Sequence, residues 1–324
     1  MVNASQSAQT DRDPRLSPPK KWLPDRALKC DRVGAVRSMN VTLSGSTGLI
    51  GRALIDTFSE KGWNIHPVPR DSFKLSDEEF LAHHIEGADV VISLTGATIL
   101  KRWTNSYKKV IYESRVETTK KIVSAIKMAK VKPRLFISNS AIGIYDPVSV
   151  HDEESTSFAD DFLGRLCRDW EAAAFSAKDL SRVVVLRTGI VLSRKGGAMK
   201  TMYTPFSLGL GGVIGTGDQF FSFIHIRDLM HVFSFVVEHE NISGVVNAVA
   251  PNPTTNYHLT KIFGKVLVQG TFLKIPAVVL KARYGEAAST LITGQQVIPA
   301  KLLASGFAFE FPTIEKSLLD LYRV

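Results

Sequence analysis

Three evenly spaced glycines mark the residues best suited to bind an anion. Gly45, Gly48 and Gly51 follow a short apolar stretch and precede residues 49–58, whose apolar positions recur at helical spacing. A strand, a glycine turn and a helix in this order present backbone N–H groups and the positive end of the helix dipole to a phosphate. The alternative is a turn that only packs a helix on a sheet. We predict a phosphate-binding turn made of Gly45, Ser46, Thr47, Gly48, Leu49, Ile50 and Gly51.

The residue that follows the second predicted strand bears on which dinucleotide binds there. Residues 64–68 form this strand, and Arg70 stands where folds that bind NAD usually carry an acid for the ribose hydroxyls. A guanidinium group suits a 2′-phosphate, so Arg70 favours NADP over NAD. The adjacent Asp71 leaves open the alternative of a solvated loop arginine.

Strands and helices then alternate along the chain. We predict strands at 88–94, 134–140 and 182–188, a small helix at 77–84, and longer helices at 105–130 and 160–178. This alternation with short links predicts an α/β fold, a Rossmann doubly wound parallel sheet. Ligands bind at the carboxyl ends of such strands, which places Leu94, Thr95 and Gly96 beside the cofactor.

The pattern changes after Gly189, where a glycine-rich stretch begins. We predict a Rossmann NADP-binding domain over 39–190, to which 218–250 returns through a strand at 220–226, a helix at 228–238 and a strand at 245–249. Residues 191–217 and 251–324, which end in an amphipathic helix near 314–322, are expected to form a smaller C-terminal substrate lobe. Residues 1–38 contain four prolines and no periodicity, and predict a disordered leader.

Composition limits the classes of partner. The 324 residues have a net charge of +9, but no dense basic run with interleaved aromatic residues, which argues against nucleic-acid binding. No run approaches the roughly 20 apolar residues of a membrane span. The only cysteines, Cys30 and Cys167, exclude a disulfide framework and suit a reducing cytoplasm. We therefore expect a cytoplasmic protein with a small-molecule substrate, no membrane partner and no metal.

Longer segments of the chain resemble one protein family. These segments are GSTGLIG at 45–51, RWT at 102–104, SRVETT at 114–119, SNSAIGIYD at 138–146, NAVAPNPTTN at 247–256 and GQQVIPAKLLASGF at 294–307. They are similar to the extended short-chain dehydrogenase/reductases, and within them to the atypical, epimerase-like members with a C-terminal domain of unknown function. The resemblance runs from residue 39 to about residue 321. It implies a Rossmann fold, NADP(H) as cofactor, and an oxidoreductase or epimerase with an unassigned substrate.

Compared with typical members of that superfamily, the chain lacks the catalytic pair. Those enzymes use a tyrosine acid with a lysine four residues further on, and a serine that polarises the carbonyl. Glu171 matches a family glutamate, and counting back from it places Leu163 at the tyrosine position and Cys167 at the lysine position. We expect both side chains on one helix face, directed toward the nicotinamide ribose. Ser140 matches the superfamily serine, and Ser138 lies beside it among the expected cofactor contacts.

Other side chains therefore become candidates for the chemistry. Tyr145 is a candidate acid or a packing residue. Arg115 is expected near the cofactor and the reaction, and the alternative is an ion pair with its glutamate neighbours. Arg102 and Trp103 follow the third strand and would hold a flat, anionic substrate, unless Trp103 only packs between lobes. His225 either contacts substrate or caps a structural network.

The resemblance leaves two functions open. Sugar-nucleotide enzymes carry an arginine where this chain has Phe221, which makes a sugar-nucleotide substrate less expected. The first function is an NADP-dependent oxidoreductase or epimerase with a nonstandard acid. The alternative is a non-catalytic NADP-binding regulatory or scaffold protein.

Overall fold

A six-stranded parallel sheet forms the centre of the computed structural model, which describes residues 38–73 and 78–322. Its strand order is β11-β6-β4-β3-β1-β2. The chain runs from β1 to β2 on one side and then to β3 on the other, so the direction of winding changes between β1 and β3. Such a point is where open α/β sheets bind ligands. The strands are β1 (Asn40–Ser44), β2 (Asn64–Val68), β3 (Val90–Ser93), β4 (Leu135–Ala141), β6 (Arg182–Thr188) and β11 (Gly244–Ala248).

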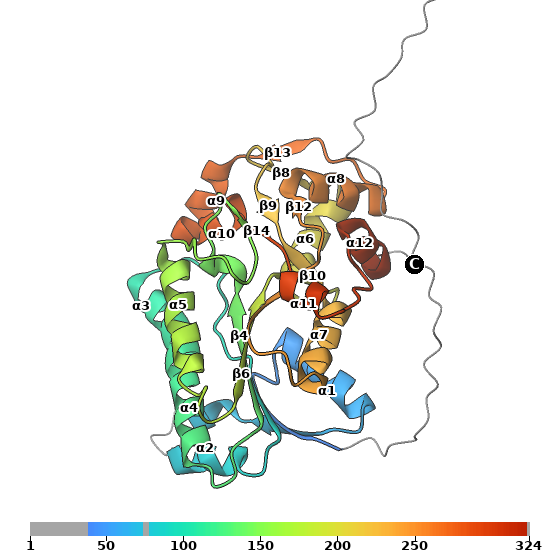
Figure 1. The fold of residues 1–324 in the computed structure, drawn as a ribbon. Coiled ribbons are helices and arrows are strands. Elements are labelled where there is room, and N and C mark those ends of the chain that lie inside the picture. Colours follow the sequence, from blue (N-terminus) through green and yellow to red (C-terminus); the bar gives the residue numbers. More distant parts are fainter. Residues whose placement is uncertain (1–37, 74–77, 323–324) are drawn as a thin grey trace, which may run out of the picture. The chain divides into compact units, whose positions relative to one another are not determined.

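Helices cover both faces of this sheet (Figure 1). On one face, α1 (Leu49–Glu60) and α7 (Ile226–Glu238) pack against β1, β3 and β6. On the other face, α2 (Glu78–Ile85), α4 (Thr118–Met128) and α5 (Phe162–Phe175) bury their apolar sides. Strands covered on both faces read as nearly continuous apolar runs, which explains why they were visible in the sequence. The predicted Rossmann fold is confirmed.

The predicted single helix at 105–130 is wrong in one respect. It consists of α3 (Asn105–Tyr112), a π-helical turn η2 (Glu113–Glu117) and α4. Thr104 caps α3, because its hydroxyl accepts a hydrogen bond from the Tyr107 backbone at 3.1 Å. A π turn holds an extra residue and rotates the side chains that follow it, and such turns are frequent at functional sites. Here the turn buries Arg115.

The remaining elements form pairs of short strands and a second set of helices. The predicted strand at 220–226 is two strands with different partners. β9 (Phe220–Phe221) pairs with β12 (Thr254–Thr255), and β10 (Phe223–His225) pairs with β7 (Ile190–Leu192). The leader predicted at 1–38 lies almost wholly outside the described residues, and the division into lobes stays a prediction. No helix in 38–73 and 78–322 is both long and apolar enough to span a bilayer. The elements outside the central sheet and its main helices are η1 (Arg70–Phe73), η3 (Ile142–Ile144), β5 (Val150–His151), β7 (Ile190–Leu192), α6 (Gly197–Ser207), β8 (Gly212–Ile214), β9 (Phe220–Phe221), β10 (Phe223–His225), β12 (Thr254–Thr255), α8 (Asn256–Val266), β13 (Leu273–Ile275), α9 (Ala277–Tyr284), η4 (Gly285–Ala288), α10 (Ser289–Ile292), β14 (Gln296–Val297), α11 (Ala300–Ala304) and α12 (Ile314–Tyr322).

Candidate functional site

The glycine turn joins β1 to α1 and has a shape that only glycines permit. Gly45 has φ +79°, and a Cβ on it would lie 2.8 Å from the carbonyl carbon of Leu94. A Cβ on Gly51 would lie 2.3 Å from the Gly45 carbonyl oxygen. The first turn of α1 contains no acidic residue, so its positive end has no charged side chain of its own. This geometry suits a bound phosphate.

Three further predicted cofactor contacts lie at the same sheet edge. Val68 pairs with Ser44, so the exposed Arg70, two residues later, follows the strand next to the glycine turn. The Leu94 backbone N–H donates to the Ser44 carbonyl at 3.1 Å, which holds the end of β3 beside this turn. The Thr95 hydroxyl is buried and has no hydrogen-bond partner among the described residues. It is one of nine buried polar side-chain atoms without a partner in the described ranges, and it lies at the sheet edge where a cofactor would bind.

Arg115 is the buried cation of this edge. Its guanidinium donates to the carbonyl oxygens of Ala97, at 3.0 Å, and Ile111, at 3.3 Å. It lies 5.5 Å from the centre of the Trp170 ring and 3.0 Å from where a Gly96 Cβ would be. Burial lowers its pKa from the ordinary value.

The alternative in which Arg115 pairs with its glutamate neighbours is wrong. Glu113 lies 3.7 Å from the amine of Lys109, and Glu117 lies 2.9 Å from that of Lys120. Within 38–73 and 78–322, no carboxylate forms an ion pair with Arg115. A buried cation without an acid is costly to the folded chain, which points to an anionic or polar ligand.

Leu163 and Cys167 lie on the inward side of α5, as expected for the two positions of the missing pair. Leu163 is half-buried beside Gly143, and Cys167 is buried. Burial, then the charge of Glu171, raises the pKa of the Cys167 thiol to about 12, although nearby Arg115 acts in the opposite direction. The thiol is therefore protonated at neutral pH and is a poor nucleophile. At the position where typical members carry a lysine on α5, this chain has Cys167, and the nearby positive charge comes from Arg115.

Ser140 belongs to a buried polar network. Its hydroxyl donates to Glu171 Oε1 at 2.7 Å. Arg187 donates to both oxygens of Glu171, at 2.9 and 2.7 Å. The hydroxyl proton of Ser140 is thus directed to a carboxylate rather than to the cofactor edge. Sequence reasoning missed Arg187, although an arginine inside the apolar strand RVVVLRT was the available signal. Ser138 is also buried in β4.

Tyr145 extends this network. Its side chain is 0% exposed, and its ring stacks on His151 with centroids 4.6 Å apart. Its hydroxyl accepts from Arg187 at 2.8 Å and lies 2.8 Å from the Asp152 carbonyl and 2.9 Å from Asn247 Oδ1. Burial raises the pKa of Tyr145. These contacts use the hydroxyl within the protein and favour the packing role over the proton donor.

The loop after β3 separates the two residues expected to hold substrate. Trp103 is buried, donates to the Ile99 carbonyl at 2.9 Å and meets the ring of Phe162 edge-on. It therefore packs in the interior. Arg102 is exposed and donates to the Ala282 carbonyl at 3.4 Å. It lines a surface hollow of about 580 Å³ together with Lys101, Thr104, Tyr107, Arg283 and Tyr284.

His225 has a structural place in the fold. Its Nδ1 accepts from the Arg227 backbone at 3.3 Å and so caps α7, and its ring lies 3.9 Å from that of Phe311. Burial lowers the pKa of His225 to about 4, even though the Asp320 carboxylate is 3.3 Å from Nε2. A neutral imidazole at this position supports the structural network rather than contact with substrate.

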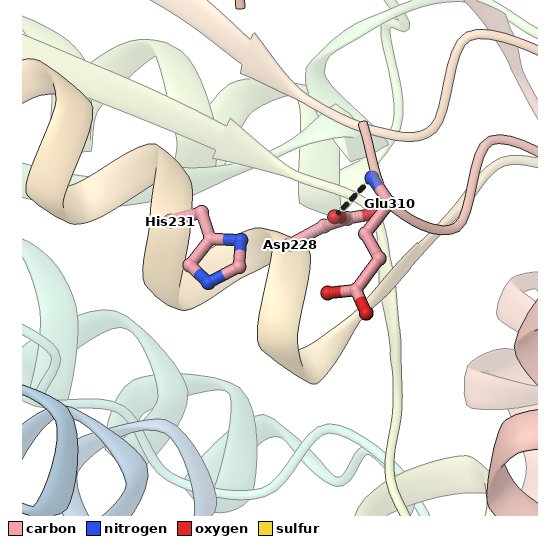
Figure 2. A group of neighbouring side chains, drawn as sticks. All are labelled: Asp228, His231 and Glu310. Atoms are coloured by element: carbon pink, nitrogen blue, oxygen red, sulfur yellow. Dashed lines mark hydrogen bonds between the residues drawn. The ribbon is translucent and has the colours of Figure 1, made fainter. Parts of the chain in front are cut away.

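Asp228, His231 and Glu310 are grouped around the start of α7 (Figure 2). Each offers one ligand atom within 4.8 Å of the others, a spacing that invites comparison with a metal site. Both oxygens of Asp228 accept backbone N–H groups, from Glu310 and Phe311, at 2.9 Å. Glu310 forms an ion pair with Arg227. We therefore interpret this group as structural: it holds residues 310–311 against α7.

A glycine turn at the switch point of a parallel sheet defines a dinucleotide-binding α/β protein. Residues 41–249 match the NAD dependent epimerase/dehydratase family, and residues 275–321 match a domain of unknown function. The chain belongs to the NAD-dependent epimerase/dehydratase family, which confirms the resemblance seen in its motifs.

Relatives with the same architecture extend over nearly the whole chain. The human epimerase family protein SDR39U1 is 36% identical over 291 residues, covering 87% of this chain and 99% of the human protein. A chloroplastic homologue of it from Arabidopsis thaliana is 32% identical, covering 86% of each chain. The crystal structure of human SDR39U1 with NADPH matches with a TM-score of 0.82, over 88% of this chain and 99% of that one.

Proposed function

We propose that this protein binds NADP(H) and acts as an oxidoreductase or epimerase on a small molecule. The human relative, 36% identical, was solved with NADPH. The glycine turn fits a pyrophosphate, because Gly45 and Gly51 leave the backbone close-packed and α1 begins without an acid. In this proposal Arg70, which is exposed two residues after β2, would bind the 2′-phosphate, and the buried hydroxyl of Thr95 would contact the cofactor. The bound cofactor would supply or accept a hydride.

The observation that carries the catalytic part of the proposal is the buried guanidinium of Arg115. It lies near Cys167, which we align with the usual lysine by counting back from Glu171. We propose that Arg115 takes over the lysine's charge and binds hydroxyls of the nicotinamide ribose or an anionic oxygen of the substrate. A guanidinium stays protonated and cannot relay protons. Arg115 would therefore stabilise negative charge electrostatically, which suits substrates that need no strong acid from α5.

The second candidate function is a non-catalytic NADP-binding regulatory or scaffold protein. It is favoured by Leu163 and Cys167, which cannot supply the acid or the ammonium group, and by the buried hydroxyl of Tyr145. We also propose a cytoplasmic location, because the chain has only two cysteines and the one in the described part, Cys167, is a free thiol.

A cofactor titration and a substrate screen would test both functions. NADPH binding is measured by fluorescence, and NADPH oxidation is followed against aldehydes, ketones and quinones. The parent chain, Arg115→Met and the matched control Arg165→Met, at an exposed arginine of α5, are compared at saturating NADPH. A loss of turnover in Arg115→Met but not in Arg165→Met supports the proposed catalytic function. Binding without turnover in any class supports the non-catalytic function, and no NADPH binding refutes the proposal.

A further inference from the structure

One part of the chain carries positive charge without any acid. Residues 189–217 and 241–285 contain no aspartate or glutamate. They contain eight basic residues, and they form α6, β8, α8, β13 and α9, most of which group at the top of Figure 1. Lys265, Lys274 and Lys281 are exposed and have no ion pair within the described ranges. The eight basic residues are Arg194, Lys195, Lys200, Lys261, Lys265, Lys274, Lys281 and Arg283.

The same elements expose large apolar side chains. Helix α9 has no buried residue, and Val278 is 68% exposed. Phe272, in the segment between α8 and β13, is 93% exposed. The end of α6 lies against this segment, because a Cβ on Gly209 would be 3.4 Å from Gln269 Oε1. We define the apolar–cationic face as Leu208, Leu210, Val268, Phe272, Val278 and Val279 with Lys265, Lys274 and Lys281.

Val268 is held in a strained conformation on this face. It has φ +57°, and it is the one non-glycine residue with positive φ in the described ranges. A β-branched residue is especially disfavoured there, whereas glycine or asparagine fits without much strain. Its side chain is nevertheless 88% exposed and contributes little to the core.

We propose that the apolar–cationic face binds the surface of an anionic phospholipid membrane. Apolar side chains that project from a turn and a helix, with lysines between them, suit insertion among lipid headgroups. The lysines would meet the negative surface potential, and their alkyl stems tolerate the interface. The earlier expectation of no membrane partner was based on the lack of a spanning segment, which surface binding does not need.

Vesicle co-sedimentation of the full chain would test whether the lysines of this face contribute to membrane binding. We expect binding to vesicles of phosphatidylcholine mixed with phosphatidylserine, weak binding to phosphatidylcholine alone, and release by salt. Replacing Lys265, Lys274 and Lys281 together by glutamine should lower partitioning roughly a hundredfold, because each lysine contributes about fivefold. The matched control replaces Lys127, Lys130 and Lys178, which are exposed on or beside α4 and α5. No binding by the parent, or equal losses in both triple variants, would overturn the proposal.

Two apolar variants test the insertion itself. Phe272→Ser should weaken partitioning tenfold or more, whereas Val148→Ser, at an exposed valine near β5, should not change it. Val268→Gly should raise the melting temperature and yet weaken partitioning, a combination that a purely structural role does not produce. Light scattering without vesicles tests whether a second copy of the chain, rather than a membrane, covers the apolar–cationic face. Dimerisation abolished by Phe272→Ser, with unchanged vesicle binding, would overturn the lipid assignment.

Discussion

Replacing Arg115 by methionine separates the contribution of this side chain to ligand binding from its contribution to the stability of the fold. Methionine keeps much of the length of the side chain and its contact with Trp170, but it removes the charge and the donors. In the folded chain the guanidinium donates to two carbonyl oxygens and has no carboxylate partner in 38–73 and 78–322. We therefore expect a large effect on ligand binding and a small effect on stability.

The size of both effects follows from the contacts of Arg115. The two charge-assisted hydrogen bonds contribute about 1.5–3 kcal/mol each, and the cation–π attraction to Trp170 contributes about 1 kcal/mol. The variant loses these three contributions, although methionine still packs on the ring. The variant also avoids burying a cation, which costs several kcal/mol. These contributions nearly cancel, so the free energy of unfolding should change by at most about 2 kcal/mol. Losing one charge-assisted bond to a ligand should weaken binding about ten- to hundredfold.

Three measurements decide the outcome for Arg115→Met. Urea unfolding gives the change in stability, fluorescence titration gives the NADPH dissociation constant, and initial rates at saturating NADPH give turnover. Arg165→Met serves as the control. The reasoning is refuted if Arg115→Met binds NADPH and turns over like the parent. A loss of stability above about 4 kcal/mol would instead identify Arg115 as a structural residue.

Three other predictions follow from single residues. Arg70→Gln should weaken NADPH binding about ten- to hundredfold and leave NADH binding nearly unchanged by fluorescence titration, and equal losses would exclude a role at the 2′-phosphate. His225→Asn keeps a capping side chain but removes a group whose folded pKa is about 4. Because the unfolded histidine takes up a proton near pH 6.5 and the folded one does not, the parent should lose about 3 kcal/mol more than the variant between pH 7 and pH 4 in urea unfolding. An identical pH dependence would contradict the burial of a neutral ring. Val268→Gly should raise the free energy of unfolding by about 1 kcal/mol through relief of its backbone strain, and a fall would show that the valine packs usefully.

The local pattern of the sequence was sufficient for the sheet and the phosphate-binding turn. The buried strand β6 is a nearly continuous apolar run and was predicted at its observed bounds. The edge strand β2, which is mostly exposed, was also predicted at its observed bounds. The glycines were informative for a similar reason. The geometry of a strand–turn–helix is local, and the lack of room for a Cβ at Gly51 follows from it, because the atoms in the way belong to Gly45 and Ser46. At Gly45 the space is taken by Leu94, which comes from a distant segment.

The tertiary structure decided which side chains meet. The register that pairs Ser140 with Arg187 brings Glu171 between α5 and the sheet, and this directs the serine hydroxyl away from the role that its position implied. Arg115 lies in a π turn, which no periodicity predicts, and its guanidinium is near Cys167. Glu113 and Glu117, two positions away on either side, point elsewhere and pair with lysines. Hydrophobic periodicity depends on neighbours along the chain. The partner of a buried charge and the exposure of α9 depend on residues brought together from distant segments, so only the folded structure could determine them.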